Sequence, residues 1–197
     1  MDNEITLHRG LQGVYFDRSE TTFIDGKDGV LEYRGYNIND LAANSSFEET
    51  SYLLIYGKLP NKDELSEFDS TLKSYRKLPE EIFDVIKLVK DSHPMDALRT
   101  AVSALASYDE DRNDNSVEAT IRKGIRLTSQ VATIVMAHHN IRHGNDPIEP
   151  SEKLNHAGNF LYMLNGDIPD QDTIDLMDKD FVLHADHGSN ASAFTAR

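Results

Sequence analysis

The chain has 197 residues, which is one or two domains' worth of sequence and enough to bury a sizeable core. Its 34 acidic residues outnumber its 20 basic ones, and the net charge of −14 argues against nucleic acid or an anionic membrane as partner. The lack of cysteine excludes disulfides, thiolate zinc sites and a cysteine nucleophile. No apolar run resembles a signal peptide or a membrane span, so we expect a soluble, cytoplasmic protein.

The first 36 residues differ from the rest of the chain. Short β-prone runs occur at residues 14–16, 21–24 and 30–33, and Asp-Gly pairs separate the last two. Glycine tolerates the positive φ that tight turns need, so Asp-Gly between apolar runs is typical of a hairpin. The sequence therefore predicts a strand-and-turn segment over residues 1–36, followed by a helical part over residues 37–197.

Helical spacing of apolar residues begins near residue 39, and stop and start signals divide the segments. The first predicted helix covers residues 39–56, and Gly57 closes it. Asn61 caps the second helix, because its side chain can accept hydrogen bonds from first-turn amides. Pro79 and Pro94 stand where first-turn prolines open the third and fourth helices. The fourth is rich in Ala and Ser, which favours close approach of helices or subunits.

The second half of the chain continues in the same way. We interpret the polar run at residues 109–115 as a solvated loop. A long helix follows and ends in the Gly and Pro residues of 144–150. A further helix is predicted to start at Ser151, and Asp170 caps a last helix that runs towards Leu183. The predicted fold class is mainly α, with a small β element at its start.

Histidines are the first candidates for chemistry. We interpret His8 and His156 as surface residues, and His93 as a helix cap. His139 and His143 are four residues apart at a helix end, a spacing that can place two imidazoles on one metal. No cysteine lies near them, and histidines at a helix C-terminus also complement its dipole. We therefore expect no metal site.

The C-terminal run from Phe181 to Arg197 combines an apolar helix end, two histidines, an aspartate and a small-residue turn. Imidazolium groups and free amides at a helix start both favour anions, so the run suits an anionic ligand. Asp186 is placed to hold the tautomer of a neighbouring imidazole. Two alternatives stay open: His184 and His187 form a metal pair, or they only cap a helix.

The run HADHGSNASAFTAR resembles the substrate-histidine segment of the citrate synthase family, which includes the 2-methylcitrate synthases. Further stretches resemble the family in order and spacing, namely RGLQGV, FIDGKDGVLEYRGYNINDLA, YLLIYGKLPNKDEL and HPMDALRTAVSALASYD. The resemblance covers nearly the whole chain. It implies a mainly α-helical fold in two domains and a homodimer. It also implies condensation of acetyl-CoA or propionyl-CoA with oxaloacetate, with no metal or organic cofactor.

The resemblance assigns roles within that C-terminal run. By motif, His187 is the oxaloacetate-binding histidine, and its imidazole donates to the substrate. Asn190 and Ser192 stand beside it, and Ser192 would orient the histidine that stabilises the enol. His184, one helical turn earlier, is a weaker candidate for a supporting role. Many members carry Glu at the position of Gly188, a departure that leaves the histidine in place.

The sequence stops at Arg197, inside the resembling segment and at about half the family's usual length. By resemblance, residues 37–197 are the helical part of a large domain, and the small CoA-binding domain is absent. The family's other catalytic histidines and its aspartate base match nothing here, so we expect the chain alone to be inactive. Two interpretations follow: the N-terminal portion of a citrate synthase-type acyltransferase, or a natural non-catalytic remnant that binds a dicarboxylate or associates with another subunit.

Overall fold

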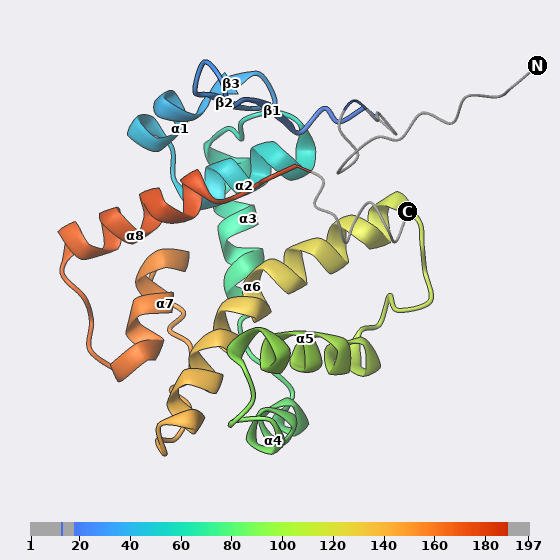
Figure 1. The fold of residues 1–197 in the computed structure, drawn as a ribbon, viewed down its shortest axis with the longest axis vertical. Coiled ribbons are helices and arrows are strands. Elements are labelled where there is room, and N and C mark those ends of the chain that lie inside the picture. The colour runs from blue at the N-terminus through green and yellow to red at the C-terminus, as the bar shows by residue number, and fades with distance from the viewer. Residues whose placement is uncertain (1–12, 14–17, 189–197) are drawn as a thin grey trace, which may run out of the picture.

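The structure is a computed structural model that describes residue 13 and residues 18–188. Within this part of the chain, eight α-helices and one three-stranded antiparallel sheet make up the fold (Figure 1). The predicted mainly α fold class is confirmed. In the same part of the chain, no helix has both the length and the apolar character needed to cross a membrane.

The sheet is a hairpin with a short third strand. β1 (Thr22–Asp25) pairs with β2 (Val30–Tyr33), and β2 pairs with β3 (Tyr36–Asn37). Gly29 in the connecting turn has φ +67°, a conformation that glycine adopts without steric strain. The predicted hairpin is confirmed, whereas the two-residue third strand was too short to predict. The expected strand at residues 14–16 lies outside the described residues.

The single helix predicted over residues 39–56 is wrong, because two helices occupy this stretch. They are α1 (Ile38–Asn44) and α2 (Phe47–Tyr56). The Ser46 side chain accepts the Glu49 backbone N–H, and the Glu49 carboxylate accepts the Ser46 N–H. This capping box starts a new helix where hydrophobic spacing alone suggested continuity. Gly57 closes α2 with φ +79°, as predicted.

The remaining helices are α3 (Lys62–Ser74), α4 (Glu80–Leu88), α5 (Pro94–Leu105), α6 (Val117–Arg142), α7 (His156–Asn165) and α8 (Gln171–Leu183). The caps predicted at Asn61 and Asp170 are confirmed, since both side chains accept first-turn amides. Pro79 immediately precedes α4 rather than standing inside it. The start predicted at Ser151 is wrong, because the Asn155 side chain caps α7 instead.

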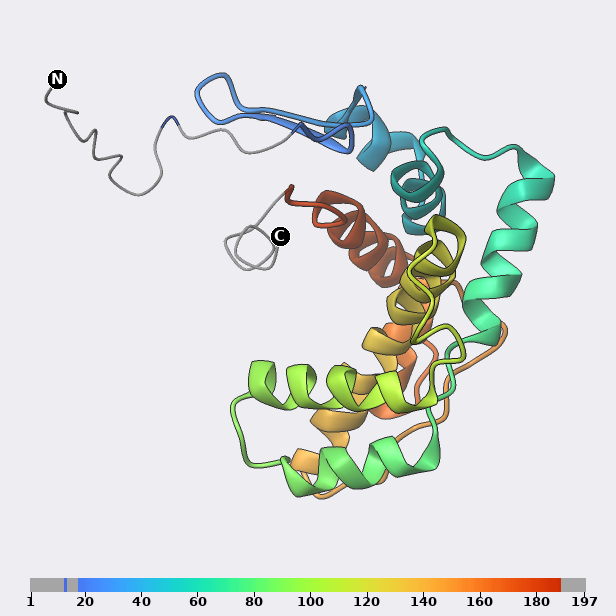
Figure 2. The same cartoon turned by 90° about the vertical axis from the view of Figure 1, so that its right-hand side faces the viewer.

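Helix α6 is the centre of the packing. Three of the four hydrophobic clusters in the described part of the chain contain α6 residues, which pack on α4 and α5, on α2 and α3, and on α7. The fourth cluster joins the sheet, α1, α2 and α8, and consists of Tyr33, Ile38, Leu41, Leu53 and Val182. Figures 1 and 2 place this fourth cluster's elements at the opposite end of the molecule from α4 and α5.

Candidate functional site

The candidate anion site follows α8. This helix lies beneath the sheet and α1, as Figure 2 shows, and its buried Val182 packs in the cluster around Tyr33. After Leu183 the chain turns away from the helix and carries His187. Packing of α8 on α1, α2 and Tyr33 therefore decides where this histidine-bearing turn begins.

Two side chains of the hairpin hold the turn. The Tyr33 hydroxyl lies 3.0 Å from the Leu183 carbonyl oxygen and 3.1 Å from that of Asp186, and these two acceptors share its single proton. It also accepts the Asp186 backbone N–H at 3.3 Å. The Thr22 hydroxyl donates to the Asp186 carboxylate. The Asp186 carboxylate thus binds Thr22, and the role predicted for it, holding an imidazole's tautomer, stays a prediction.

The predicted site residues fall into three groups. His187 is exposed on the turn, and Gly188 after it has φ +74°, which fits the predicted small-residue turn. His184 Nδ1 lies 2.8 Å from the Asp180 carbonyl oxygen, so its ring is bound back to the last turn of α8. Asn190 and Ser192 lie outside the described residues.

The surface position predicted for His156 is wrong. Its side chain is buried, with 4% of the residue exposed, and its ring contacts those of Phe47 and Phe181. Burial, assisted by the nearby charge of Arg76, lowers the pKa of His156 to about 4. Isolated histidines in sequence carry no signal of burial, which here results from packing between α2, α7 and α8. His8 lies outside the described residues.

The histidines near the end of α6 are bound to nearby backbone or to each other. His138 is buried, and its Nε2 lies 3.2 Å from the Lys90 carbonyl oxygen. The rings of His139 and His143 are in contact. The pKa of His139 is lowered, mainly by burial and to a smaller extent by the neighbouring imidazoles. His93 caps α5 as predicted, because its Nδ1 accepts the Met95 N–H. Among the residues with described positions, no three His, Cys, Asp or Glu side chains are grouped to hold a metal.

A largely buried polar cluster joins α2, α7, α8 and the segment that follows α3. We call Glu48, Arg76, His156 and Asp178 the helix junction. Glu48 accepts the first amide of α7, the His156 N–H, at 2.7 Å. Both Asp178 oxygens accept the first amide of α2, the Phe47 N–H, at 3.3 and 3.2 Å. Each of these helix starts is thus capped by a carboxylate from a different helix.

Charge is unfavourable at several positions in the helix junction. Burial raises the pKa of Asp178 to about 6, against the lowering effect of the Phe47 hydrogen bond, and the nearby Glu48 adds to the rise. Arg76 is only 2% exposed and donates to the carbonyl oxygens of Ser151 and Leu154. Burial lowers the pKa of this guanidinium as well.

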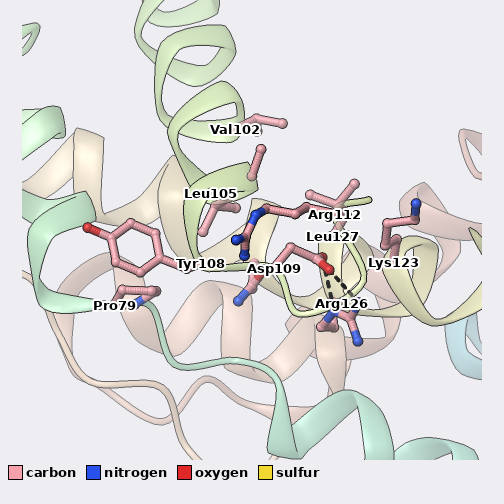
Figure 3. Close-up of a pocket in the computed structure, with 11 residues that line it drawn as sticks. Pro79, Val102, Leu105, Tyr108, Asp109, Arg112, Lys123, Arg126 and Leu127 are labelled. Atoms are coloured by element: carbon pink, nitrogen blue, oxygen red, sulfur yellow. Dashed lines mark hydrogen bonds and ion pairs between the residues drawn. The ribbon is translucent and has the colours of Figure 1, made fainter. Parts of the chain in front are cut away.

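The loop before α6 forms a second polar cluster. We call Asp109, Asp111, Arg122 and Arg126 the loop clasp. Arg126 Nη2 lies 2.8 Å from Asp109 and 2.7 Å from Asp111, while Arg122 bonds Asp111 at 2.6 Å. The Asp109–Arg126 pair borders a pocket of about 240 Å³ (Figure 3). Most residues of the loop interpreted as solvated are exposed, but the loop is also bound to α6, and the side chains of Asp109 and Asp111 are only 17% and 16% exposed.

The fold described above is that of solved citrate synthases. A crystal structure of citrate synthase from Pyrobaculum aerophilum matches 95% of this chain and 49% of its own, with a TM-score of 0.90 and 38% identity. The structure of citrate synthase from Thermotoga maritima matches 97% of this chain and 50% of its own, with a TM-score of 0.83 and 34% identity.

Sequence comparison gives the same family. Residues 10–197 match the family described as "Citrate synthase, C-terminal domain". The chain is 45% identical to citrate synthase of Haloferax volcanii, over 96% of this chain and 52% of that protein. It is 35% identical to 2-methylcitrate synthase of Mycobacterium tuberculosis, over 100% of this chain and 50% of that protein. The chain belongs to the citrate synthase family, and it spans about half the length of these curated relatives.

Proposed function

We propose that this chain supplies the oxaloacetate-binding histidine, His187, to an enzyme that condenses an acyl-CoA with oxaloacetate. The acyl group is acetyl or propionyl, and the products are CoA with citrate or 2-methylcitrate. The observation that carries the proposal is the exposed position of His187 on a turn fixed between α8 and the sheet. The names of the relatives, citrate synthase and 2-methylcitrate synthase, support both acyl groups.

In this reaction the thioester loses an α-proton, its α-carbon attacks the ketone carbon of oxaloacetate, and water then hydrolyses the thioester bond and releases CoA. An imidazole N–H of His187 donates a hydrogen bond to an oxygen of oxaloacetate and helps to hold this dianion for attack. The Asp base and the other histidines are proposed to come from the half of the relatives' length that this chain does not span. Asn190, Ser192 and His184 are proposed to support the site.

We also propose that the enzyme is a homodimer that uses α5. The small residues Ala97 and Ala101 face inward and are buried, Ala101 in the cluster with α4 and α6. Met95 on the same helix is 63% exposed, and Leu98 is half-buried. The small residues therefore pack within the subunit. The apolar surface of Met95 and Leu98 is left for contact with a second copy of the chain.

The test is CoA release by the protein purified from its native source, with oxaloacetate and either acetyl-CoA or propionyl-CoA. His187→Ala should lower kcat/KM for oxaloacetate by roughly 10- to 100-fold, the effect of one charge-assisted hydrogen bond. His143→Ala removes an exposed imidazole at the end of α6 and serves as the matched control.

Unchanged kinetics in His187→Ala would remove this residue from the site. The 197 residues alone are expected to release no CoA. If the native protein also releases none but binds a dicarboxylate, it is the non-catalytic binding protein of the second interpretation.

A further inference from the structure

One hydroxyl group connects the sheet to the end of α8. Tyr33 is 0% exposed, and its ring packs in the cluster with Leu41, Leu53 and Val182. Its hydroxyl is the hydrogen-bond partner of the Leu183 and Asp186 carbonyls, which lie 150 and 153 residues away in sequence. Carbonyls in the last turn of a helix lack partners within the helix, so Tyr33 satisfies a group that α8 itself leaves open.

Thr22 holds the same turn from the neighbouring strand. Thr22 and Tyr33 are directly opposite each other in the β1–β2 pair. Together they contact the backbone N–H, the carbonyl oxygen and the carboxylate of Asp186. Asp186 immediately precedes His187, so these contacts fix the direction in which the chain enters His187.

We propose that Tyr33 and Thr22 are positioning residues for His187. The sheet sets the start of the histidine-bearing turn, and the turn sets the place of the imidazole relative to oxaloacetate. Small displacements of a binding group reduce the rate strongly, and sites held by rigid elements are the more precise. The proposal rests on the proposed function of His187, and it adds residues from a distant strand pair to the oxaloacetate site.

The experiment compares Tyr33→Phe with Tyr36→Phe. Both remove one phenolic hydroxyl from the same sheet, but Tyr36 is 43% exposed on β3 and the Tyr33 ring remains buried in its cluster. In the native enzyme, Tyr33→Phe should raise KM for oxaloacetate about three- to tenfold, the range expected for one hydrogen bond, and leave KM for acyl-CoA unchanged. Tyr36→Phe should leave both values unchanged.

A second readout does not require activity. Amide hydrogen exchange at Asp186, followed by NMR, should become faster in Tyr33→Phe but not in Tyr36→Phe, because only Tyr33 accepts this N–H. Thr22→Val should act in the same direction, and Thr22→Ser, which keeps the hydroxyl, should restore the wild-type values. Comparison of Thr22→Val with Thr22→Ser still tests the proposal if Tyr33→Phe does not fold.

The results separate the two proposals. If the wild-type protein releases no CoA, the proposed function fails, while Asp186 exchange still decides whether the sheet holds the turn. Equal rises of both KM values, in step with a lower Tm, would show that Tyr33 acts only on overall stability. Tyr33→Phe that matches Tyr36→Phe in both oxaloacetate KM and Asp186 exchange would overturn the positioning role.

Discussion

The helix junction and the loop clasp each contain two acidic and two basic side chains, counting His156 as basic. They differ in what determines the pKa values of these side chains. In the helix junction, burial is the main influence on pKa, and it disfavours the charged forms of Arg76, His156 and Asp178. In the loop clasp, hydrogen bonds from Arg122 and then Arg126 hold the pKa of Asp111 well below its usual range. The loop clasp therefore favours the charged form of Asp111, whereas the helix junction disfavours the charged forms of its three side chains named above.

This difference shows how each cluster contributes to the fold. The junction connects three helices and the segments that follow α3 and precede α7 through hydrogen bonds to backbone groups, so its side chains are needed even though their charges are unfavourable. The clasp joins one loop to the helix that follows it, at the surface. We expect loss of a junction residue to affect the whole molecule and loss of a clasp residue to affect one loop.

The largest effect is expected for Arg76→Ala. It removes a buried guanidinium and leaves the carbonyl oxygens of Ser151 and Leu154 without their donor, and we expect a loss of about 3 kcal/mol in the free energy of unfolding. Chemical denaturation measures it. The exposed neighbour gives the control, since Lys77→Ala should change stability by less than about 0.5 kcal/mol. Equal effects of the two variants would show that Arg76 contributes no more to stability than an exposed residue does.

The next effect is the pH dependence of the helix junction. The pKa of His156 is lowered to about 4, so its contribution is present above its unfolded value of 6.5 and lost as the pH falls through 4. The loss is about 3 kcal/mol between pH 7 and 4. Asp178, with its pKa raised to about 6, acts oppositely: its contribution is complete below its unfolded value of 3.8 and lost as the pH rises through 6. That opposing contribution is smaller, because Asp178 is only half-buried.

Two variants separate these opposing contributions in urea unfolding at pH 7 and pH 4. Asp178→Asn should become less stable on acidification by more than the wild-type protein does. His156→Phe, which places a third aromatic ring between Phe47 and Phe181, should become more stable on acidification. Parallel pH profiles for wild type and both variants would show that neither group titrates as the burial predicts.

The smallest effect is expected for Asp111→Asn in the loop clasp. It removes the shared partner of Arg122 and Arg126, so amide exchange in residues 110–115 should become faster with little change in global unfolding. Because the pKa of Asp111 is held low, its contribution is present above the ordinary aspartate value and is lost only in stronger acid. High salt should reduce the difference between wild type and variant, as for other surface ion pairs.

Local signals in the sequence predicted the local structure. Asn61, Asp170 and Gly57 each act through backbone groups within a few residues, and their roles were confirmed. The capping box of Ser46 and Glu49 was equally local and was missed, because helical spacing continued across it. Burial of His156 depends on packing of α2 against α8, which no nearby residue indicates.

The candidate site shows the same division. The motif singled out His187 as a candidate, which stays a prediction, and the structure adds the exposed turn on which it lies. No pattern near His187 points to Tyr33, since the two belong to elements at opposite ends of the described chain. The contact of Asp186 with Thr22 was not predicted for the same reason, because a neighbouring imidazole was the only partner visible in sequence.

The contact between Tyr33 and Leu183 also has a consequence for synthesis of the protein. The two residues are 150 positions apart, so at 5–20 residues per second the hairpin leaves the ribosome roughly 8–30 seconds before α8 exists. During that interval Tyr33 has no α8 carbonyl to bind and Val182 is missing from its cluster. The first described strands are therefore completed by the last described helix, and their exposed edge and side chains are what a chaperone would meet.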